Sequence, residues 1–137
     1  MKSGFLLLLA AAMVMCAVVV SADVAGSTDK EVRAVAEPML DTILEGLKTG
    51  DYAVFSRDFG DAMKEALNEE RFVKTRQQIQ QGMGNYRSRK YLGFLNKGGY
   101  SIVLWKGRFD GTSDDILIKL VISKRGDRYL VTGLWFQ

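Results

Sequence analysis

The spacing of apolar residues changes period once along the chain, close to residue 85. From Val32 to Leu47 the apolar residues recur at steps of three and four, which places them on one stripe of a helix. Thr28 or Asp29 can cap the start of this helix, and Gly50 lies just beyond its end. The pattern therefore predicts a long amphipathic helix in the first half of the chain.

Pro38 falls inside this stripe. Proline has no backbone N–H, and its ring crowds the preceding helical turn, so it disfavours a helix interior. Because the apolar stripe continues in phase across Pro38, we expect one long helix with a kink. The alternative is a helix that begins near Pro38.

Three shorter helices are predicted between residues 50 and 84. Asp51 can cap the first of them and Asp61 the second, since a short polar side chain can accept a hydrogen bond from the first turn. Asn68 opens the third, in which most side chains are polar. That last helix is expected to be solvated on most of its sides.

From Tyr86 onward the apolar residues alternate with polar ones, as in strands. The alternation predicts four strands at residues 86–95, 100–109, 116–123 and 128–136. The connecting segments are short, so the strands are expected to form hairpins and hence an antiparallel meander. Helices followed by an antiparallel sheet predict an α+β fold.

Alternation also indicates which sheet face is buried. In the third strand the residues Ile116, Ile118, Leu120 and Ile122 share one side, which should meet the helices. The other sheet face is expected to carry Val103, Trp105, Val121 and Val131. Because one layer of helices covers only one face, this apolar second face predicts a homodimer.

The first 22 residues predict export. Lys2 precedes an apolar run from Phe5 to Val20, and Val20-Ser21-Ala22 has small residues where signal peptidase cleaves. We expect a signal peptide over 1–22, a single domain over 23–137 and a secreted or periplasmic location. The run is only slightly shorter than the ~20 residues of a spanning helix, so the alternative is a membrane anchor through residues 5–20.

Composition limits the chemistry that the domain can perform. The chain has no histidine, and its one cysteine, Cys16, lies in the predicted signal peptide. These absences exclude thiol and Ser-His-Asp catalysis, Cys/His zinc sites and histidine-ligated haem. We therefore expect no metal and no cofactor, and the chemistry left is that of carboxylates, tyrosines and lysines.

Charge is unevenly distributed between the two halves. Residues 23–85 contain 8 Lys and Arg against 12 Asp and Glu, whereas residues 86–137 contain 10 against 4. The favoured interpretation is that two layers of opposite sign attract each other when packed. The alternative is an anion-binding group formed by Arg87, Arg89, Lys90, Lys106 and Arg108. A nucleic-acid ligand is not expected for an exported protein.

Three segments carry a resemblance to a known superfamily. They are a Leu-Lys-Thr-Gly-Asp-Tyr turn at 47–52, a Phe-Ser-Arg-Asp-Phe segment at 55–59 and a closing Tyr-Leu-Val-Thr-Gly-Leu-Trp strand at 129–135. The chain resembles the nuclear-transport-factor-two-like α+β cone, and in particular a family of small exported prokaryotic domains of unknown function within it. The resemblance implies helices packed on a curved sheet, but this superfold hosts isomerases, dehydratases and binding modules alike.

A cone of this kind is expected to enclose an apolar pocket. The predicted lining is Met39, Ile43, Leu47, Tyr52, Phe55, Ile118, Leu120, Leu134 and Phe136. Such a wall favours an apolar ligand. We therefore expect a non-catalytic domain that binds a small apolar ligand or a protein partner.

The alternative function is a small carboxylate-dependent isomerase or hydro-lyase that acts on an apolar substrate. Isomerases of this superfold need a carboxylate base that faces a tyrosine or protonated carboxyl donor. The candidates are Asp41, Asp58 and Tyr52, whereas Asp51 is read as a helix cap. A buried, unpaired aspartate in an open pocket would favour this enzyme.

Overall fold

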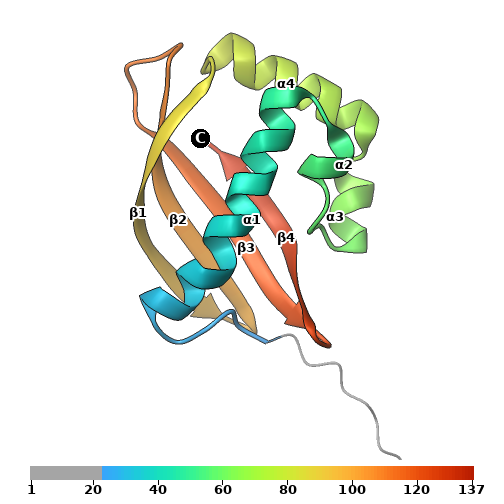
Figure 1. Cartoon of the computed structure of the whole chain (residues 1–137), viewed down its shortest axis with the longest axis vertical. Coiled ribbons are helices and arrows are strands. Elements are labelled where there is room, and N and C mark those ends of the chain that lie inside the picture. The colour runs from blue at the N-terminus through green and yellow to red at the C-terminus, as the bar shows by residue number, and fades with distance from the viewer. Residues whose placement is uncertain (1–22) are drawn as a thin grey trace, which may run out of the picture.

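The structure is a computed structural model that describes residues 23–137 (Figure 1). The predicted signal peptide or anchor, residues 1–22, lies outside the described residues. The helices are α1 (Asp29–Thr49), α2 (Tyr52–Phe55), α3 (Asp61–Ala66) and α4 (Glu69–Gly82). The strands are β1 (Tyr86–Lys97), β2 (Tyr100–Phe109), β3 (Ile116–Arg125) and β4 (Arg128–Phe136).

The four strands form one antiparallel sheet in the order β1-β2-β3-β4. This confirms the predicted meander and the α+β class. Helix α1 lies along one face of the sheet, α3 contacts β4, and α4 crosses the end at which β1 begins and β4 finishes (Figure 1). No helix within residues 23–137 is long and apolar enough to cross a membrane.

Helix α1 is continuous through Pro38, so the alternative of a helix beginning near Pro38 is wrong. Thr28 is its N-cap and accepts a hydrogen bond from the Glu31 backbone N–H. Gly50 closes it in the left-handed conformation, at φ 73°. Pro38 and Ala34 are both exposed, so water can satisfy the carbonyl that proline leaves without a partner.

The predicted caps of the shorter helices are confirmed in two of three cases. Asp51 accepts from the Val54 N–H, and Asn68 accepts from the Arg71 N–H. The prediction for α3 is wrong, because Gly60 occupies the N-cap without a side-chain hydrogen bond and Asp61 is the first helical residue.

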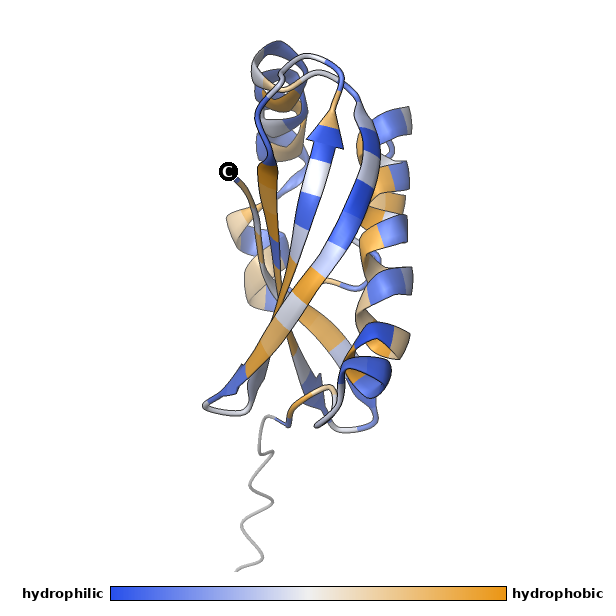
Figure 2. Cartoon of the chain, turned by 90° about the vertical axis from the view of Figure 1, so that its left-hand side faces the viewer, coloured by the Kyte–Doolittle hydropathy of each residue, from blue (hydrophilic) through white to orange (hydrophobic). Residues whose placement is uncertain are grey.

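The core lies between α1 and the sheet. The hydrophobic residues of α1 are on its sheet-facing side (Figure 2), and Val32, Ala36, Leu40 and Ile43 are almost fully buried. On the sheet, Ile116, Ile118, Leu120 and Ile122 are also buried, which confirms the predicted core face of β3. Burial of these side chains on both layers provides the main force that holds α1 on the sheet.

An aromatic cluster attaches α2 and α4 to this core. The ring of Phe55 lies 4.6 Å from that of Phe72 and 5.1 Å from that of Phe59, measured between centroids. Tyr52 packs against Phe72 at 5.6 Å. Because Phe72 is the one fully buried side chain of α4, this contact fixes one end of an otherwise polar helix.

The predicted assignment of the second sheet face is wrong for three of its four residues. Val103, Trp105 and Val131 are completely buried within a single chain. Val103 pairs with Leu120, and Trp105 pairs with Ile118. Since residues directly opposite each other share a sheet face, Val103 and Trp105 point toward the helices rather than toward solvent.

Val131 reaches the same buried face because the pairing of β3 with β4 contains a register shift at Val121/Ile122. An extra residue in one strand reverses the alternation beyond it. Ile122 thus faces Val131, and Leu120 faces Leu134. Only Val121 of the predicted interface set lies on the outer face.

Candidate functional site

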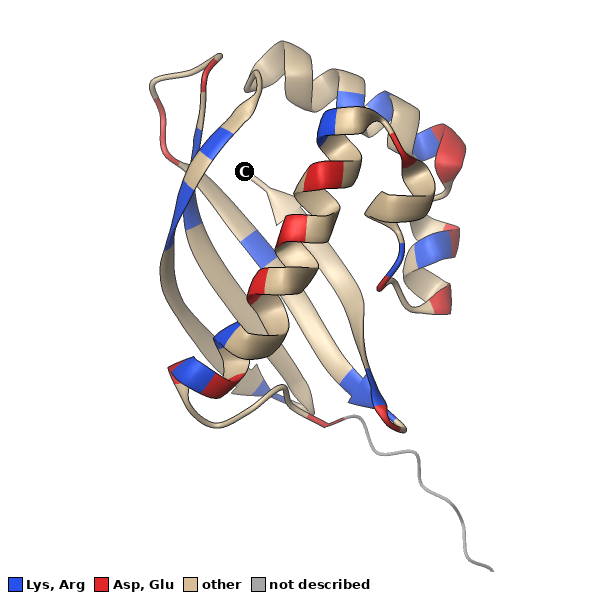
Figure 3. Ribbon diagram, in the orientation of Figure 1, with Lys and Arg blue, Asp and Glu red and all other residues tan. Residues whose placement is uncertain are grey.

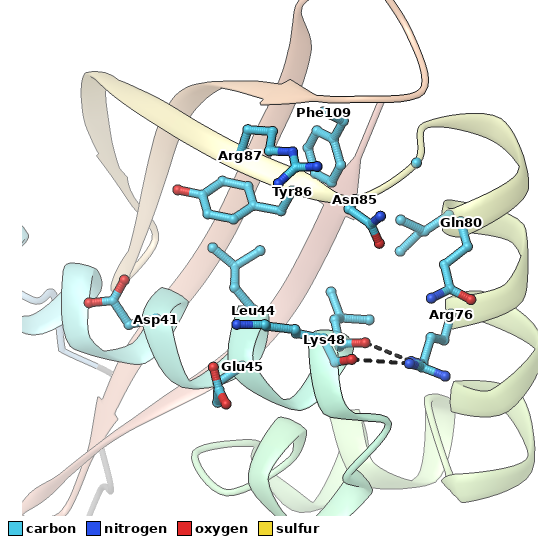
Figure 4. A pocket seen from close by; sticks show the side chains of 13 residues that line it. Asp41, Leu44, Glu45, Lys48, Arg76, Gln80, Asn85, Tyr86, Arg87 and Phe109 are labelled. Carbon is cyan, nitrogen blue, oxygen red and sulfur yellow. Dashed lines mark hydrogen bonds between the residues drawn. The ribbon is translucent and has the colours of Figure 1, made fainter.

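A cavity of about 690 Å³ opens between the C-terminal half of α1, the C-terminal half of α4 and the start of β1 (Figure 4). Its lining consists of Asp41, Leu44, Glu45, Leu47, Lys48, Arg76, Ile79, Gln80, Gly84, Asn85, Tyr86, Arg87 and Phe109. The cavity therefore draws residues from three separate parts of the sequence.

The interior of this cavity is apolar and its margin is polar. Leu44 and Phe109 are buried, and Leu47 and Ile79 are partly buried. The Tyr86 ring packs edge-on against Phe109, with ring centroids 5.7 Å apart. The charged lining residues reach solvent at the margin, a distribution that suits a ligand with an apolar body and a polar end.

A second cavity of about 320 Å³ lies next to the first and shares Leu47 and Ile79 with it. Its remaining lining residues are Phe55, Leu67, Thr75, Gln78, Met83, Leu134, Trp135 and Phe136. This lining contains no charged side chain. The two cavities lie on either side of the same two apolar residues, beneath α4.

Arg76 joins α4 to the end of α1. Its guanidinium donates to the backbone carbonyl of Leu47 at 2.6 Å and to that of Lys48 at 3.1 Å. These are among the last carbonyls of α1, which have no partner within the helix. Arg76 therefore holds α4 in position over both cavities.

Asp110 organises the opposite margin of the larger cavity. Its carboxylate accepts from the Asn85 backbone N–H at 2.6 Å and from Arg87 at 2.6 Å. These hydrogen bonds lower the pKa of Asp110 below its ordinary value, and the one from the Asn85 backbone N–H has the largest effect. The contacts hold the start of β1 beside the β2–β3 connection.

A partly buried polar network lies between α1 and β1, beside the cavity. Arg89 donates to Glu37 at 2.6 Å and to Asp41 at 2.7 Å. It also donates to the Tyr86 hydroxyl at 3.1 Å. The Trp105 indole N–H donates to Glu37 at 3.0 Å. The side chain of Arg89 is only 15% exposed and that of Glu37 only 23%, so both need these partners.

This network keeps Glu37 ionised. Burial alone would raise its pKa, but the hydrogen bonds from Trp105 and Arg89 outweigh burial and lower it. A general base for proton abstraction works best with a pKa near the working pH, and Glu37 is moved away from that range. The contacts of Arg89 with Glu37 and Asp41 agree with the interpretation that the acidic and basic halves attract each other (Figure 3).

The structure does not bring the predicted catalytic candidates together. Asp41 pairs with Arg89, and Asp58 pairs with Arg57 at 3.2 Å. The Tyr52 hydroxyl donates to the Leu67 backbone carbonyl at 2.8 Å. Each of the three candidates is therefore bound to a different partner, and no two of them face each other. The described residues contain no buried side-chain nitrogen or oxygen without a hydrogen-bond partner.

The predicted pocket residues divide into two groups. Leu47, Phe55, Leu134 and Phe136 line the smaller cavity, and Leu47 also lines the larger one. The other predicted residues line neither of these two cavities: Met39, Ile43, Ile118 and Leu120 are buried in the core, and Tyr52 packs against that core. Close packing of large side chains fills the space near the sheet centre.

The predicted anion-binding group is dispersed. Arg89 points inward, whereas Lys90 pairs directly with Lys106 on the outer sheet face. Arg108 donates to Asp115 at 3.0 Å, and Arg87 alone reaches the larger cavity. The alternation of side chains along β1 separates neighbours onto opposite faces.

Sequence reasoning missed Lys48 and Arg76 as cavity residues. Lys48 belongs to the last turn of α1, and Arg76 lies in the polar helix α4. Nothing in the local pattern distinguishes either residue from an ordinary solvated cation. Among residues 23–137, no group of three or more His, Cys, Asp and Glu side chains is placed to hold a metal ion.

The fold and cavity define a small α+β domain with helices on one face of an open antiparallel sheet. The chain belongs to DUF3887, a family described as proteins of unknown function, whose sequence model matches residues 41–124. The match starts in the middle of α1 and ends in β3, and so it includes most of the cavity. Comparison with curated proteins and with solved structures found no match.

Proposed function

We propose that this protein is an exported, non-catalytic binding domain that holds a small apolar or amphipathic ligand at its open end. The observation that carries the proposal is the cavity of about 690 Å³ with an apolar interior and a polar margin. Small-molecule sites commonly have volumes of ~300–1,000 Å³ and the same distribution of polarity. The adjoining apolar cavity of about 320 Å³ extends the space available to a ligand.

The same proposal places the domain in the nuclear-transport-factor-two-like superfamily. Its support is the order of the elements, with helices first, and the packing of α1 on one face of the sheet. In this view α4 partly closes the wide end of a cone. Superfamily membership by itself does not specify an activity.

Ligand binding can be tested by thermal unfolding in the presence of 1-decanol, a neutral probe with an apolar chain. A ligand at one hundred times its dissociation constant stabilises a protein by ~2.7 kcal/mol, which raises Tm by several degrees in a domain of this size. Ile79→Trp should remove the shift, because Ile79 lines both cavities. Val73→Trp is the matched control, since Val73 lies on the same helix and is 61% exposed.

Three outcomes of the Tm measurement distinguish binding in the cavities from binding elsewhere and from no binding. A Tm shift in the wild type and in Val73→Trp, but not in Ile79→Trp, supports binding in the cavities. A shift that persists in Ile79→Trp would locate the probe elsewhere. No shift in any of the proteins, either with 1-decanol or with charged probes of the same chain length, would refute the proposed function.

The enzyme alternative has less support. Glu37 and Asp41 are each bound by Arg89, and Asp58 is bound by Arg57. A carboxylate that is already neutralised by a guanidinium is a weak base. We therefore favour binding over isomerase or hydro-lyase activity.

The homodimer expected from the sequence stays a prediction, with a corrected surface. The outer sheet face carries Ile102, Leu104 and Val121, together with the 44%-exposed Trp135. A dimer through this face should dissociate in Trp135→Asp, as measured by sedimentation velocity. A wild type that is monomeric at high micromolar concentration would exclude it.

Export also stays a prediction, and a secreted or periplasmic location follows from it. Cleavage after Ala22 should produce a protein that begins at Asp23, because small residues occupy the positions that the peptidase reads. Intact-mass measurement on the native protein tests this directly. A mass that includes residues 1–22 would instead support the membrane anchor.

A further inference from the structure

Three cations from three different elements surround the larger cavity. Lys48 comes from α1, Arg76 from α4 and Arg87 from β1. In Figure 4 the Lys48 side chain lies across the space below Tyr86, with its ammonium toward Leu44, whereas the Arg76 guanidinium lies on the opposite side, next to α4. The carboxylates of Asp41 and Glu45, which belong to the lining set, point away from this space (Figure 4).

The charges of these residues are not equally compensated. Arg87 is paired with Asp110, and Asp41 is paired with Arg89. In contrast, no ion pair within residues 23–137 includes Lys48 or Arg76. Glu45 is also in none of these ion pairs, but its carboxylate points away from the space (Figure 4). The margin therefore contains two unpaired positive charges, Lys48 and Arg76, and one unpaired carboxylate that is turned outward.

Arg76 also retains hydrogen-bonding capacity. Its Nε and one terminal nitrogen, Nη2, donate to the carbonyls of Leu47 and Lys48. The other terminal nitrogen, Nη1, has two further N–H groups. These contacts fix the plane of the guanidinium, so the free N–H groups are already oriented and little side-chain entropy is lost when they bind. The Lys48 ammonium adds three donors on a flexible stem.

We propose that the cavity selects single-chain carboxylates, with the carboxylate held by Lys48 and Arg76. The apolar chain would extend past Leu47 and Ile79 into the smaller, uncharged cavity. A carboxylate can accept charge-assisted hydrogen bonds from both cations, whereas a hydroxyl head group accepts weaker ones and neutralises no charge, and an ammonium is repelled. This inference rests on the proposed function and names the class of ligand for the same cavity.

The test compares three probes with the same ten-carbon chain: decanoate, 1-decanol and decyltrimethylammonium. Binding to the purified exported protein is measured by isothermal titration calorimetry at pH 7.5. Decanoate should bind at least about tenfold more tightly than 1-decanol, which corresponds to ~1.4 kcal/mol, the low end of a hydrogen bond to a charged group. Decyltrimethylammonium should bind most weakly.

Lys48→Gln should remove most of the preference for decanoate over 1-decanol. Lys48 is exposed at the end of α1, so the variant should remain folded. Lys64→Gln is the matched control, because Lys64 is an exposed lysine of α3 that does not line either cavity. It should retain the full preference.

Equal affinities for decanoate and 1-decanol, unaffected by Lys48→Gln, would overturn the inference and leave the proposed function intact. Tightest binding of decyltrimethylammonium would also overturn it, since the carboxylates of the lining would then select the ligand. If none of the three probes binds, both the inference and the proposed function fail.

Discussion

Gly46 is the position at which helix propensity and packing predict opposite effects of one substitution. It lies inside α1 and is buried. Alanine is favoured over glycine in a helix interior by about 1 kcal/mol, so propensity alone predicts that Gly46→Ala stabilises the protein. However, a Cβ at this position would lie 2.5 Å from the backbone nitrogen of Phe55 and 2.6 Å from its Cα.

The steric effect should exceed the gain in propensity. The added methyl meets backbone atoms of α2, and these cannot move aside by a change of rotamer. Phe55 is itself buried against Phe59 and Phe72, so displacing α2 also disturbs that cluster. Overpacking of this kind costs about 1–3 kcal/mol, and we take the upper part of that range because the contact is with backbone.

After the gain in propensity is subtracted, Gly46→Ala should lower the free energy of unfolding by about 1–2 kcal/mol, and Tm by about 4–10 °C in a domain of this size. Urea unfolding followed by far-UV circular dichroism measures the change. Gly82→Ala is the control, because no atom lies within 4 Å of a Cβ at the end of α4. It should be neutral or stabilising. A Gly46→Ala protein at least as stable as the wild type would refute the argument.

Three further predictions concern charge and packing. The folded pKa of Glu37 is lowered from 4.5, so its contribution to stability is present above pH 4.5 and lost on acidification through the folded pKa. Glu37→Gln should therefore lose less stability between pH 7 and pH 3 in urea titrations. Burial and the hydrogen bond to Asp29 raise the pKa of Tyr91 from 10.0 to about 12, so the stability that comes from the neutral phenol is full below pH 10 and is lost progressively as the pH rises to about 12. Asp29→Asn should lower this pKa in a phenolate absorbance titration at 295 nm. Phe72→Ala should reduce the free energy of unfolding by about 3–5 kcal/mol in the same urea assay, because it empties the centre of the aromatic cluster.

The order and type of the elements could be predicted because each is encoded within a few neighbouring residues. Each of these signals depends only on residues close together in the sequence. They are the apolar stripe from Val32 to Leu47, the caps Thr28, Asp51 and Asn68, and the change to alternation at Tyr86. Short hairpin links then leave the meander as the natural topology. The structure confirms these elements, with strand ends extended by at most two residues.

The orientation of two strands could not be predicted in this way. In β2 and β4 both sides are apolar, so alternation does not identify the buried face of either strand. The register of β2 with β3 decides which face of β2 is buried, because Val103 must share a face with its partner Leu120. The shift at Val121/Ile122 then reverses the side of Val131. Strand pairing and a bulge in its register depend on two segments at once. The pattern of a single segment therefore cannot predict them.

The cavity also depends on tertiary structure. Arg89 meets Glu37 across 52 residues of sequence, and Arg76 meets Leu47 across 29. These long-range contacts decide which cations are paired with a carboxylate and which stay unpaired at the cavity margin. Local spacing and composition are enough to predict the helices and the strands and to show that residues 23–137 contain no cysteine or histidine side chain. Only the folded chain decided where the interior is filled and where it stays open, because side chains fill the interior where the layers lie close and leave it hollow where α4 crosses their open end.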